Sequence, residues 1–313
     1  MDSIYQKINK YGKVRCDEMM KRHLTIQAGG PVKYLVFVDD REDLISLLRE
    51  LDSSGIEYFV LGHGGNTLIS ESGFEGVGII NKTEDKKVEG NKLHVDSGLD
   101  ITKASQHAMF NNLSGFEWGV GAVGSVGGNI YHNEKVKDKR FELVLSEVEA
   151  YKDGEVFSYS CKNCEFGVDE SVFHAPGMII TRAVFKLKDE TADSEQSMEY
   201  INHKNKNLPN FQPSVGPVFR HLKMDDLDLG WFDEGKQEKI KNHGEAKPKW
   251  LFDQMDLEAC DYGVSFYENN PNFIINEDNA SADAIIKTIE KMEHKVYDKY
   301  GVELKRKVHT LGF

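Results

Sequence analysis

Residues 61–67 read Leu61-Gly62-His63-Gly64-Gly65-Asn66-Thr67, and residues 121–128 read Gly121-Ala122-Val123-Gly124-Ser125-Val126-Gly127-Gly128. Each stretch is a glycine-rich turn that follows an apolar run and leads into small polar residues. Glycine lets the backbone approach a ligand closely and adopt positive φ. Consecutive exposed N–H groups in such turns form concavities that hold an anion such as a diphosphate. The two turns together therefore predict a site for an anionic ligand.

The first turn lies at the end of a predicted strand–helix–strand unit. Residues 34–38 are a short apolar run, as in a buried strand. Leucines at helical spacing follow over residues 44–51, and Gly55 is expected to end that helix. Residues 58–61 form the next strand and lead directly into the turn. We therefore expect the turn at the carboxyl end of this strand.

The rest of the chain predicts a mixed α+β protein. Gly90-Asn91 marks the turn of a hairpin over residues 86–100, and a helix over 101–110 leads to the second glycine turn. Further strands are expected at residues 76–80, 143–151, 155–159 and 178–187. A helix near the end has one apolar face, which predicts packing rather than ligand binding. The residues on this face are Ile285, Ile286, Ile289, Met292, Val296 and Tyr300.

Composition and charge exclude several classes of function. The chain has 313 residues, a formal net charge of −13, 39% hydrophobic and 29% charged residues. This is typical of a folded protein of two or three domains. The negative charge argues against non-specific binding to nucleic acid or to an acidic membrane. The chain shows no membrane span or signal peptide, so we expect a cytoplasmic protein without nucleic-acid or membrane partners.

The four cysteines suggest no metal site. Cys161 and Cys164 have the Cys-x-x-Cys spacing of a zinc or redox pair, but no second pair accompanies them. They follow a predicted hairpin rather than a strand-to-helix junction. We therefore interpret these two residues, like Cys16 and Cys260, as free thiols.

The order of the motifs resembles the UDP-N-acetylenolpyruvoylglucosamine reductases (MurB), which are flavoproteins of peptidoglycan synthesis. Seven segments are similar to family motifs and occur in the family order. They are residues 24–31, 60–70, 121–128, 166–173, 212–219, 272–276, and 301–304 with Gly312.

The resemblance implies a two-subdomain FAD-binding domain of the PCMH or vanillyl-alcohol-oxidase type with a C-terminal substrate domain. The implied boundaries are residues 1–84, 85–199 and 200–313. It also implies FAD as cofactor, with NADPH as the electron donor and a UDP-sugar as the small-molecule substrate. The residues expected at the cofactor are Gly62, Gly64, Gly65, Asn66, Thr67, Gly124, Ser125, Gly127 and Gly128.

The catalytic positions of the family are all changed. In the family, an arginine and a glutamate polarise the substrate carboxylate, and a serine protonates the carbon beside the one that receives hydride. The corresponding positions here hold Asp169, Pro217 and Lys307. Proline offers no donor hydrogen, and the other two changes reverse the charge. No residue of the usual catalytic set is therefore expected, and a changed reaction is the interpretation that we favour.

Several alternatives remain open at this point. Asp169 and Lys307 could pair with each other, because reversing both charges preserves neutrality. Ser214 or His221 could replace the missing proton donor. Arg220 occupies the place of a family lysine beside the substrate phosphates, so it is the predicted substrate-binding residue. The charged segment 223–249 departs from the family. The chain is therefore a divergent flavin oxidoreductase, a true reductase with relocated groups, or a non-catalytic binder of FAD or a nucleotide sugar.

Overall fold

A computed structural model describes residues 3–209, 211–259 and 263–313. The chain divides into two compact units, each built from three segments. Unit 1 contains Met1–Glu18, Val32–His63 and Glu75–Lys206, and unit 2 contains Met19–Pro31, Gly64–Phe74 and Asn207–Phe313. Helices and strands occur throughout, which confirms the predicted α+β class. The boundary predicted between residues 199 and 200 falls inside a helix, and the subdomain boundaries stay predictions.

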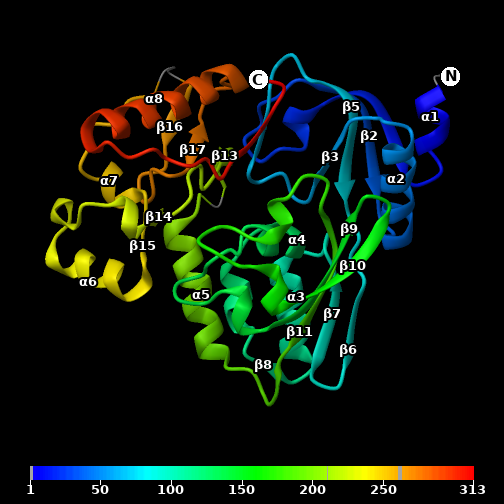
Figure 1. Ribbon diagram of the computed structural model, residues 1–313, viewed down its shortest axis with the longest axis horizontal. Helices are drawn as coiled ribbons and strands as arrows, with labels where there is room; N and C mark the ends of the chain where they lie inside the picture. Colours follow the sequence, from blue (N-terminus) through cyan, green and yellow to red (C-terminus); the bar gives the residue numbers. More distant parts are fainter. Residues whose placement is uncertain (1–2, 210, 260–262) are drawn as a thin grey trace. The chain divides into compact units, whose positions relative to one another are not determined.

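The first sheet of unit 1 has the strand order β1-β2-β5-β3, and β3 pairs with β5 in parallel (Figure 1). Its strands are β1 (Lys13–Met19), β2 (Pro31–Val38), β3 (Tyr58–Leu61) and β5 (Phe74–Asn81). Helix α2 (Arg41–Ser53) begins at Asp40, whose carboxylate accepts from two backbone N–H groups of the first turn. The leucines of α2 pack with apolar residues of β2 and β5, as their spacing predicts. A short helix, α1 (Ser3–Ile8), precedes β1.

The second sheet of unit 1 has the order β10-β9-β11-β7-β6, and all its neighbouring strands are antiparallel. The strands are β6 (Lys86–Glu89), β7 (Lys92–Asp96), β9 (Leu145–Lys152), β10 (Glu155–Ser160) and β11 (Ile179–Lys186). The two predicted hairpins are confirmed as β6–β7 and β9–β10. A small pair, β8 (Leu113–Ser114) with β12 (Lys188–Asp189), lies apart from this sheet.

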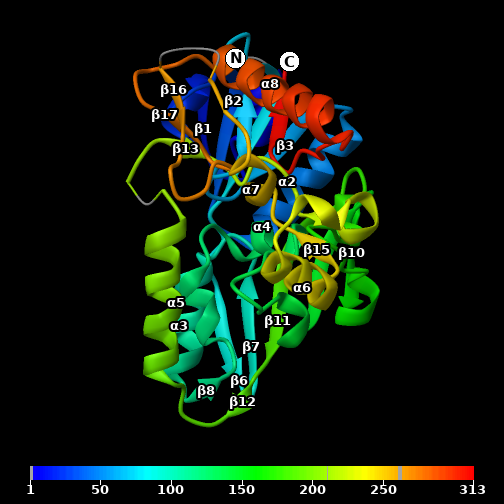
Figure 2. The ribbon, with the colours of Figure 1, turned by 90° about the vertical axis from the view of Figure 1, so that its left-hand side faces the viewer.

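Three helices accompany the second sheet: α3 (Ile101–Phe110), α4 (Val126–Tyr131) and α5 (Ser194–Asn207). Helix α3 has the predicted bounds. Figure 2 shows α3 beside α5, where the Ser197 hydroxyl donates to the Met109 sulfur at 3.3 Å. Short 3-10 turns occupy Glu117–Gly121, Phe141–Leu143, Cys161–Cys164 and Val172–His174.

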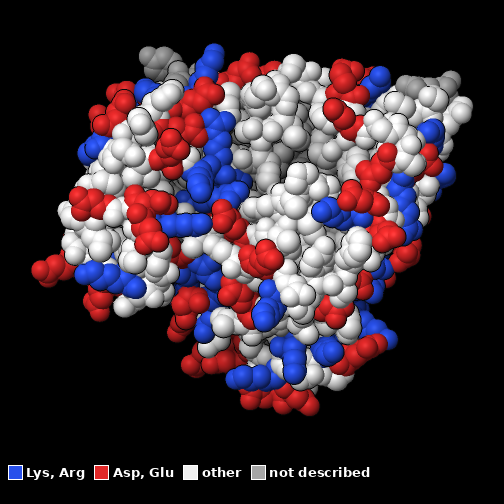
Figure 3. All heavy atoms as spheres, in the orientation of Figure 1, with Lys and Arg blue, Asp and Glu red and all other residues white. Residues whose placement is uncertain are grey.

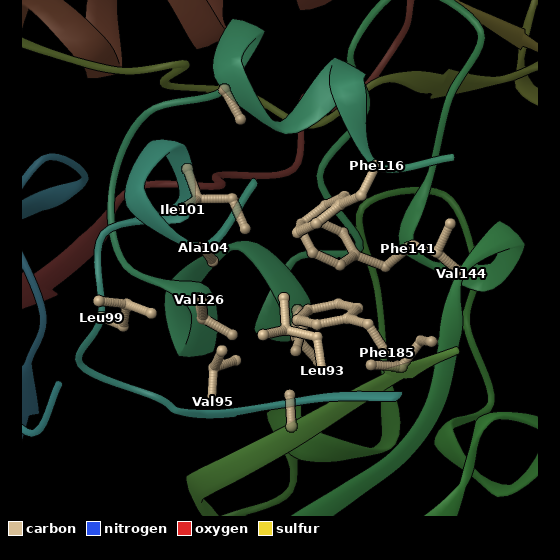
Figure 4. Close-up of a cluster of buried hydrophobic side chains, with 14 of the residues drawn as sticks. Leu93, Val95, Leu99, Ile101, Ala104, Phe116, Val126, Phe141, Val144 and Phe185 are labelled. Carbon is tan, nitrogen blue, oxygen red and sulfur yellow. The ribbon is translucent and has the colours of Figure 1, made fainter. Parts of the chain in front are cut away.

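The hydrophobic core of this part of unit 1 reaches the second glycine turn. Phe116, Phe141 and Phe185 form an aromatic group in its centre, with Phe116 and Phe185 stacked at 4.7 Å between ring centroids. Leu99 and Val126 are fully buried in the same cluster, as Figure 4 shows. Burying such side chains stabilises the fold by about 1.5–3 kcal/mol each. The turn is thus anchored in the core through Val126, together with Leu99 from the segment that follows β7.

Unit 2 combines small sheets with helices. Its strands form three groups: β13 (Ser214–Val215), β17 (Ile274–Asn276) and β16 (Val264–Phe266); β14 (Leu222–Lys223) with β15 (Glu245–Ala246); and β4 (Thr67–Ile69) parallel to β18 (His309–Leu311). Its helices are α6 (Glu234–His243), α7 (Lys249–Phe252) and α8 (Ala282–Tyr300). Short 3-10 turns occupy Met20–Arg22, Met224–Asp226 and Leu229–Trp231. The predicted apolar face of α8 is confirmed as packing: Ile285, Ile286, Ile289, Met292 and Val296 are buried, and Tyr300 is partly buried.

Three further observations bear on function. Within the described residues, no helix is both long and apolar enough to cross a membrane. The same residues contain no group of three or more histidine, cysteine or acidic side chains placed to hold a metal. Figure 3 shows positive and negative side chains intermixed over the face that it draws.

Candidate functional site

Part of the first glycine turn contacts the second within unit 1. Gly62 follows β3, and a Cβ atom placed on it would lie 2.2 Å from the Ser125 hydroxyl oxygen and 2.9 Å from Ser125 Cβ. Only glycine allows this approach. The next residue, His63, places its Nδ1 atom 3.7 Å from a carboxylate oxygen of Asp100. The structure therefore brings Gly62 and Ser125 together, as the paired turns predict.

The second turn is hydrogen-bonded to the chain segment that follows β7. Val126 N–H donates to the Leu99 carbonyl, and Gly127 N–H donates to the Ser97 carbonyl, both at a distance of 2.8 Å. In the other direction, Ile101 N–H donates to the Gly124 carbonyl at 3.0 Å. Residues 97–101 thus form a strip that fixes the course of the turn. We call residues 97–101 the support strip.

Side chains complete the shape of the turn. Ser125 is the N-cap of α4, and its hydroxyl accepts from Gly128 N–H at 3.2 Å. The buried amide of Asn129 donates to the carbonyls of Val123 and Ser125 at 2.8 and 2.9 Å. Gly124 has φ of +96°, a backbone conformation that side-chain-bearing residues rarely adopt. These constraints give the turn one defined geometry.

That geometry leaves three adjacent amides available. In the described part of the chain, the N–H groups of Val123, Gly124 and Ser125 donate to no protein acceptor. The N–H groups of Gly127 and Gly128, by contrast, are used inside the protein. Consecutive N–H groups of this kind bind an anion such as a phosphate. The sequence-based prediction for this turn named Gly124, Ser125, Gly127 and Gly128, whereas the hydrogen bonding leaves the N–H groups of residues 123–125 available.

The remaining residues of the first turn belong to unit 2. The Gly64 carbonyl accepts from Thr25 N–H at 3.2 Å. Apart from Gly65 and its two chain neighbours, no residue that the structure describes has an atom within 4 Å of the place where a Gly65 Cβ would be. Asn66 donates its side-chain amide to the Lys307 carbonyl at 3.1 Å, and its carbonyl accepts from His309 N–H. Thr67 is the first residue of β4 and pairs with His309 in β18. Their predicted role at the cofactor stays a prediction.

Asp169 occupies a tight turn of unit 1. It is only 1% exposed and has φ of +53°. The turn is closed by Gly167 N–H donating to the Glu170 carbonyl at 2.9 Å. The fully buried side chain of Asn133 donates to the Gly167 carbonyl at 3.1 Å and to Glu142 at 2.8 Å. This position therefore presents a carboxylate on a well-fixed turn.

The other two changed positions lie close together in unit 2. Lys307 is 2% exposed, and its N–H donates to the Val218 carbonyl at 2.7 Å, beside Pro217. Arg220 N–H donates to the Lys305 carbonyl at 2.9 Å. Segments 217–220 and 305–308 thus run together and carry Pro217, Arg220 and Lys307. The predicted substrate-binding residue lies beside two of the changed catalytic positions.

Asn272, the first residue of the motif segment 272–276, holds this arrangement with its side chain, a role that was not predicted. The side-chain oxygen of Asn272 accepts from Phe219 N–H, and its side-chain NH₂ donates to the Phe219 carbonyl, both at 2.9 Å. Its backbone carbonyl also accepts from Val218 N–H at 2.8 Å. Both Asn272 and Phe219 are buried. The side chain thus takes the place of a neighbouring strand, which no local sequence pattern reveals.

His309 adds a titratable group near Arg220. The pKa of His309 is lowered below its usual value of 6.5, first by desolvation among the surrounding atoms and then by the positive charge of Arg220. Both effects disfavour the imidazolium form. The two proposed substitute donors belong to the same unit. Ser214 lies in β13, where its N–H donates to the Thr25 carbonyl, and His221 follows Arg220 and directly precedes β14.

The cysteine pair is shielded rather than reactive. Cys161 and Cys164 lie on a short 3-10 turn, and burial is the main cause that raises the pKa of Cys164 to about 12, with Cys161 a smaller one. A raised pKa keeps the thiol protonated and a poor nucleophile. Among the described cysteines, Cys16, Cys161 and Cys164 are free thiols, whereas Cys260 lies outside the described residues.

Comparison with known proteins identifies two family models along the chain. A model described as an FAD binding domain matches residues 32–146. A model described as the C-terminal domain of UDP-N-acetylenolpyruvoylglucosamine reductase matches residues 207–311. The first match includes the second glycine turn and the support strip, and the second includes Pro217, Arg220 and Lys307.

Full-length relatives agree with these matches. The UDP-N-acetylenolpyruvoylglucosamine reductase of Caldanaerobacter subterraneus is 28% identical over 312 residues, which cover 98% of this chain and 96% of that protein. The protein of the same name from Clostridium tetani is 28% identical over 96% of this chain and 92% of its own length. The crystal structure of this reductase from Thermus caldophilus matches 96% of this chain and all of its own, with a TM-score of 0.73 at 22% identity. This structural similarity shows that the two proteins have the same fold.

Proposed function

Because the chain belongs to the UDP-N-acetylenolpyruvoylglucosamine reductase family, we propose that it is an FAD-dependent oxidoreductase whose reaction departs from that of its relatives. The family is one of flavoproteins of peptidoglycan synthesis. The observation that carries the proposal is the row of amides at Val123, Gly124 and Ser125, which has no protein acceptor in the described chain. A cofactor with a diphosphate suits this row without any basic side chain.

The residues present fit FAD. In the proposal, the amides of residues 123–125 contact the diphosphate, while Gly62 leaves room for the approach of Ser125. Gly127 and Gly128 shape the turn, because their N–H groups are used within the protein. Gly64, Gly65, Asn66 and Thr67 are proposed as further cofactor contacts on the basis of the family resemblance. When bound, the flavin supplies hydride transfer.

The protein's own residues argue for altered chemistry. Asp169 offers no positive charge to attract a substrate carboxylate, whereas an arginine would attract it. Pro217 has no proton to give. Lys307 can donate hydrogen bonds but cannot accept them, so it cannot take over the role of a glutamate. Arg220 can still bind an anionic group of the substrate, for which a UDP-sugar is our proposal.

Two experiments separate this proposal from its alternatives. The purified protein is expected to be yellow, with flavin absorbance released as FAD on denaturation. A colourless protein that fails to bind added FAD would overturn the proposal. We propose NADPH as the electron donor, so NADPH is expected to bleach the flavin band in the absence of oxygen.

The substrate is tested separately. NADPH consumption driven by UDP-N-acetylglucosamine enolpyruvate would indicate a true reductase with relocated catalytic groups, such as Ser214 or His221. Flavin binding without reduction by NADPH or NADH would instead indicate a non-catalytic binding protein. The triple variant Asp169→Arg, Pro217→Ser and Lys307→Glu tests the chemical argument. Gain of enolpyruvate turnover in the variant alone would support replacement of the catalytic set as the cause.

A further inference from the structure

The support strip is held by a buried polar network that joins the two sheets of unit 1. Asn81 is the last residue of β5 in the first sheet, and its amide donates to the Ser97 hydroxyl at 2.9 Å. Ser97 follows β7 of the second sheet directly. Asn81 and Ser97 are 6% and 2% exposed, so water does not compete for this bond. One buried hydrogen bond therefore connects the end of β5 in the first sheet with the support strip, which follows β7 of the second sheet.

Thr83 completes the network around Asn81. Its N–H and its hydroxyl both donate to the Asn81 side-chain oxygen, at 3.1 and 2.9 Å. The Thr83 hydroxyl in turn accepts from Gly98 N–H at 3.4 Å. All polar atoms of the Asn81 side chain thus have partners, which fixes its orientation. A fully paired buried network of this kind gives one arrangement rather than several.

The network controls the second glycine turn through the backbone. Ser97 N–H donates to the Thr181 carbonyl at 3.0 Å, and the Ser97 carbonyl accepts from Gly127 N–H at 2.8 Å. Two residues along, the Leu99 carbonyl accepts from Val126 N–H. These hydrogen bonds link Asn81, through Ser97 and the support strip, to residues 126 and 127, which directly follow the amides at residues 123–125.

We propose that Ser97, oriented by Asn81, is a positioning residue for the cofactor: it aims the amides of residues 123–125 at the diphosphate. This inference rests on the proposed function, because it assumes that FAD occupies the second glycine turn. It assigns Ser97 no contact with the cofactor. Its effect passes through the support strip, so loss of the hydroxyl changes affinity without removing a ligand contact.

The test compares Ser97→Ala with a matched control, Ser114→Ala. Both changes delete one buried serine hydroxyl of unit 1 that makes a short side-chain hydrogen bond; Ser114 is 6% exposed and donates to Glu190 at 2.7 Å. Ser114 lies in β8 and takes no part in the strip or the turn. Each variant is first checked for an intact thermal transition. The milder variant Ser97→Cys, which keeps a weak acceptor for Asn81, is expected to give an intermediate result.

Two measurements are made on each variant. Amide hydrogen exchange at Val126 and Gly127, in protein stripped of flavin, is expected to become about tenfold faster in Ser97→Ala, because the buried Asn81 amide loses its acceptor. The dissociation constant for FAD, measured by quenching of flavin fluorescence, is expected to rise about tenfold for the same reason. Ser114→Ala is expected to change neither quantity, even where its melting temperature falls equally.

The outcomes separate the two proposals. Unchanged exchange at residues 126–127 in Ser97→Ala overturns the positioning role, whether or not the protein binds flavin. An equal loss of FAD affinity in Ser97→Ala and Ser114→Ala also overturns it, because the effect would then be one of general stability. Absence of FAD binding by the unmodified protein overturns the proposed function itself.

Discussion

The approach of Gly62 to Ser125 can be tested by adding one methyl group. In Gly62→Ala, the new Cβ would lie 2.2 Å from the Ser125 hydroxyl oxygen and 2.9 Å from its Cβ. Both distances are far below the 3.5–4 Å of favourable van der Waals contact. The Ser125 side chain must turn away, and it then loses the bond with Gly128 N–H that caps α4.

The expected cost follows from these contacts. Loss of an N-cap costs about 1 kcal/mol, and overpacking at a rigid site adds about 1–2 kcal/mol. Replacing glycine by alanine recovers about 0.5 kcal/mol by restricting the unfolded chain. The net destabilisation is therefore about 1.5–2.5 kcal/mol. FAD affinity is expected to fall about tenfold, because Ser125 N–H belongs to the proposed diphosphate site; a tenfold loss corresponds to about 1.4 kcal/mol.

A second variant makes the explanation specific. Ser125→Gly removes both clashing atoms, and because glycine is itself tolerated at an N-cap it costs only a few tenths of a kcal/mol alone. The double variant Gly62→Ala, Ser125→Gly is therefore expected to be close to Ser125→Gly in stability. Urea unfolding followed by circular dichroism gives all four free energies of a double-mutant cycle. Additive effects, with a coupling below about 0.5 kcal/mol, would refute the proposed contact.

Three other predictions concern parts of the molecule away from this contact. Asn272→Ala is expected to lower the stability of unit 2 by about 2–4 kcal/mol, because it leaves the buried N–H and carbonyl of Phe219 without partners; a loss below 1 kcal/mol in urea unfolding would contradict this. The lowered pKa of His309 means that the unfolded chain binds more protons than the folded one between that pKa and about 6.5. The contribution of His309 to the free energy of unfolding is therefore complete above about pH 6.5 and is lost as the pH falls through this window. His309→Gln is therefore expected to reduce the difference between the melting temperatures at pH 7.5 and pH 5. An unchanged difference would argue against the lowered pKa. Cys164, with its pKa raised to about 12, is expected to react with iodoacetamide at pH 8 at least 100-fold more slowly than the exposed Cys16, as mass spectrometry can determine, and comparable rates would show that burial does not protect it.

Local patterns predicted much of the secondary structure. Helix α3 and the apolar face of α8 follow from periodicity, and the β6–β7 hairpin follows from Gly90-Asn91 at its turn. These features depend on residues close together in the chain. The composition of the two units was not predicted, because residues 19–31 and 64–74 join unit 2 through contacts with residues more than a hundred positions away.

In the candidate site, too, some features could be predicted from local sequence and others depend on contacts between distant residues. The glycine turns could be recognised from residue types, because tight turns and close backbone approach require glycine. Which N–H groups remain available could not, since that depends on the carbonyls of Ser97 and Leu99, which are already occupied by Gly127 and Val126. The roles of Asn272 and His309 were likewise hidden, because each acts on a segment that is distant in sequence.

The parallel pairing of β4 with β18 has a consequence for biosynthesis. Residues 67–69 leave the ribosome early, but their partner strand, residues 309–311, is made more than two hundred residues later. At typical elongation rates this delay is about 10–50 seconds. All segments of unit 1 have been synthesised once the chain reaches Lys206, so unit 1 can fold on the nascent chain before the partner strand of β4 has been made. Residues 64–74 therefore remain without the partner strand β18 during most of translation, and we expect chaperone binding to this segment to raise the yield of folded protein.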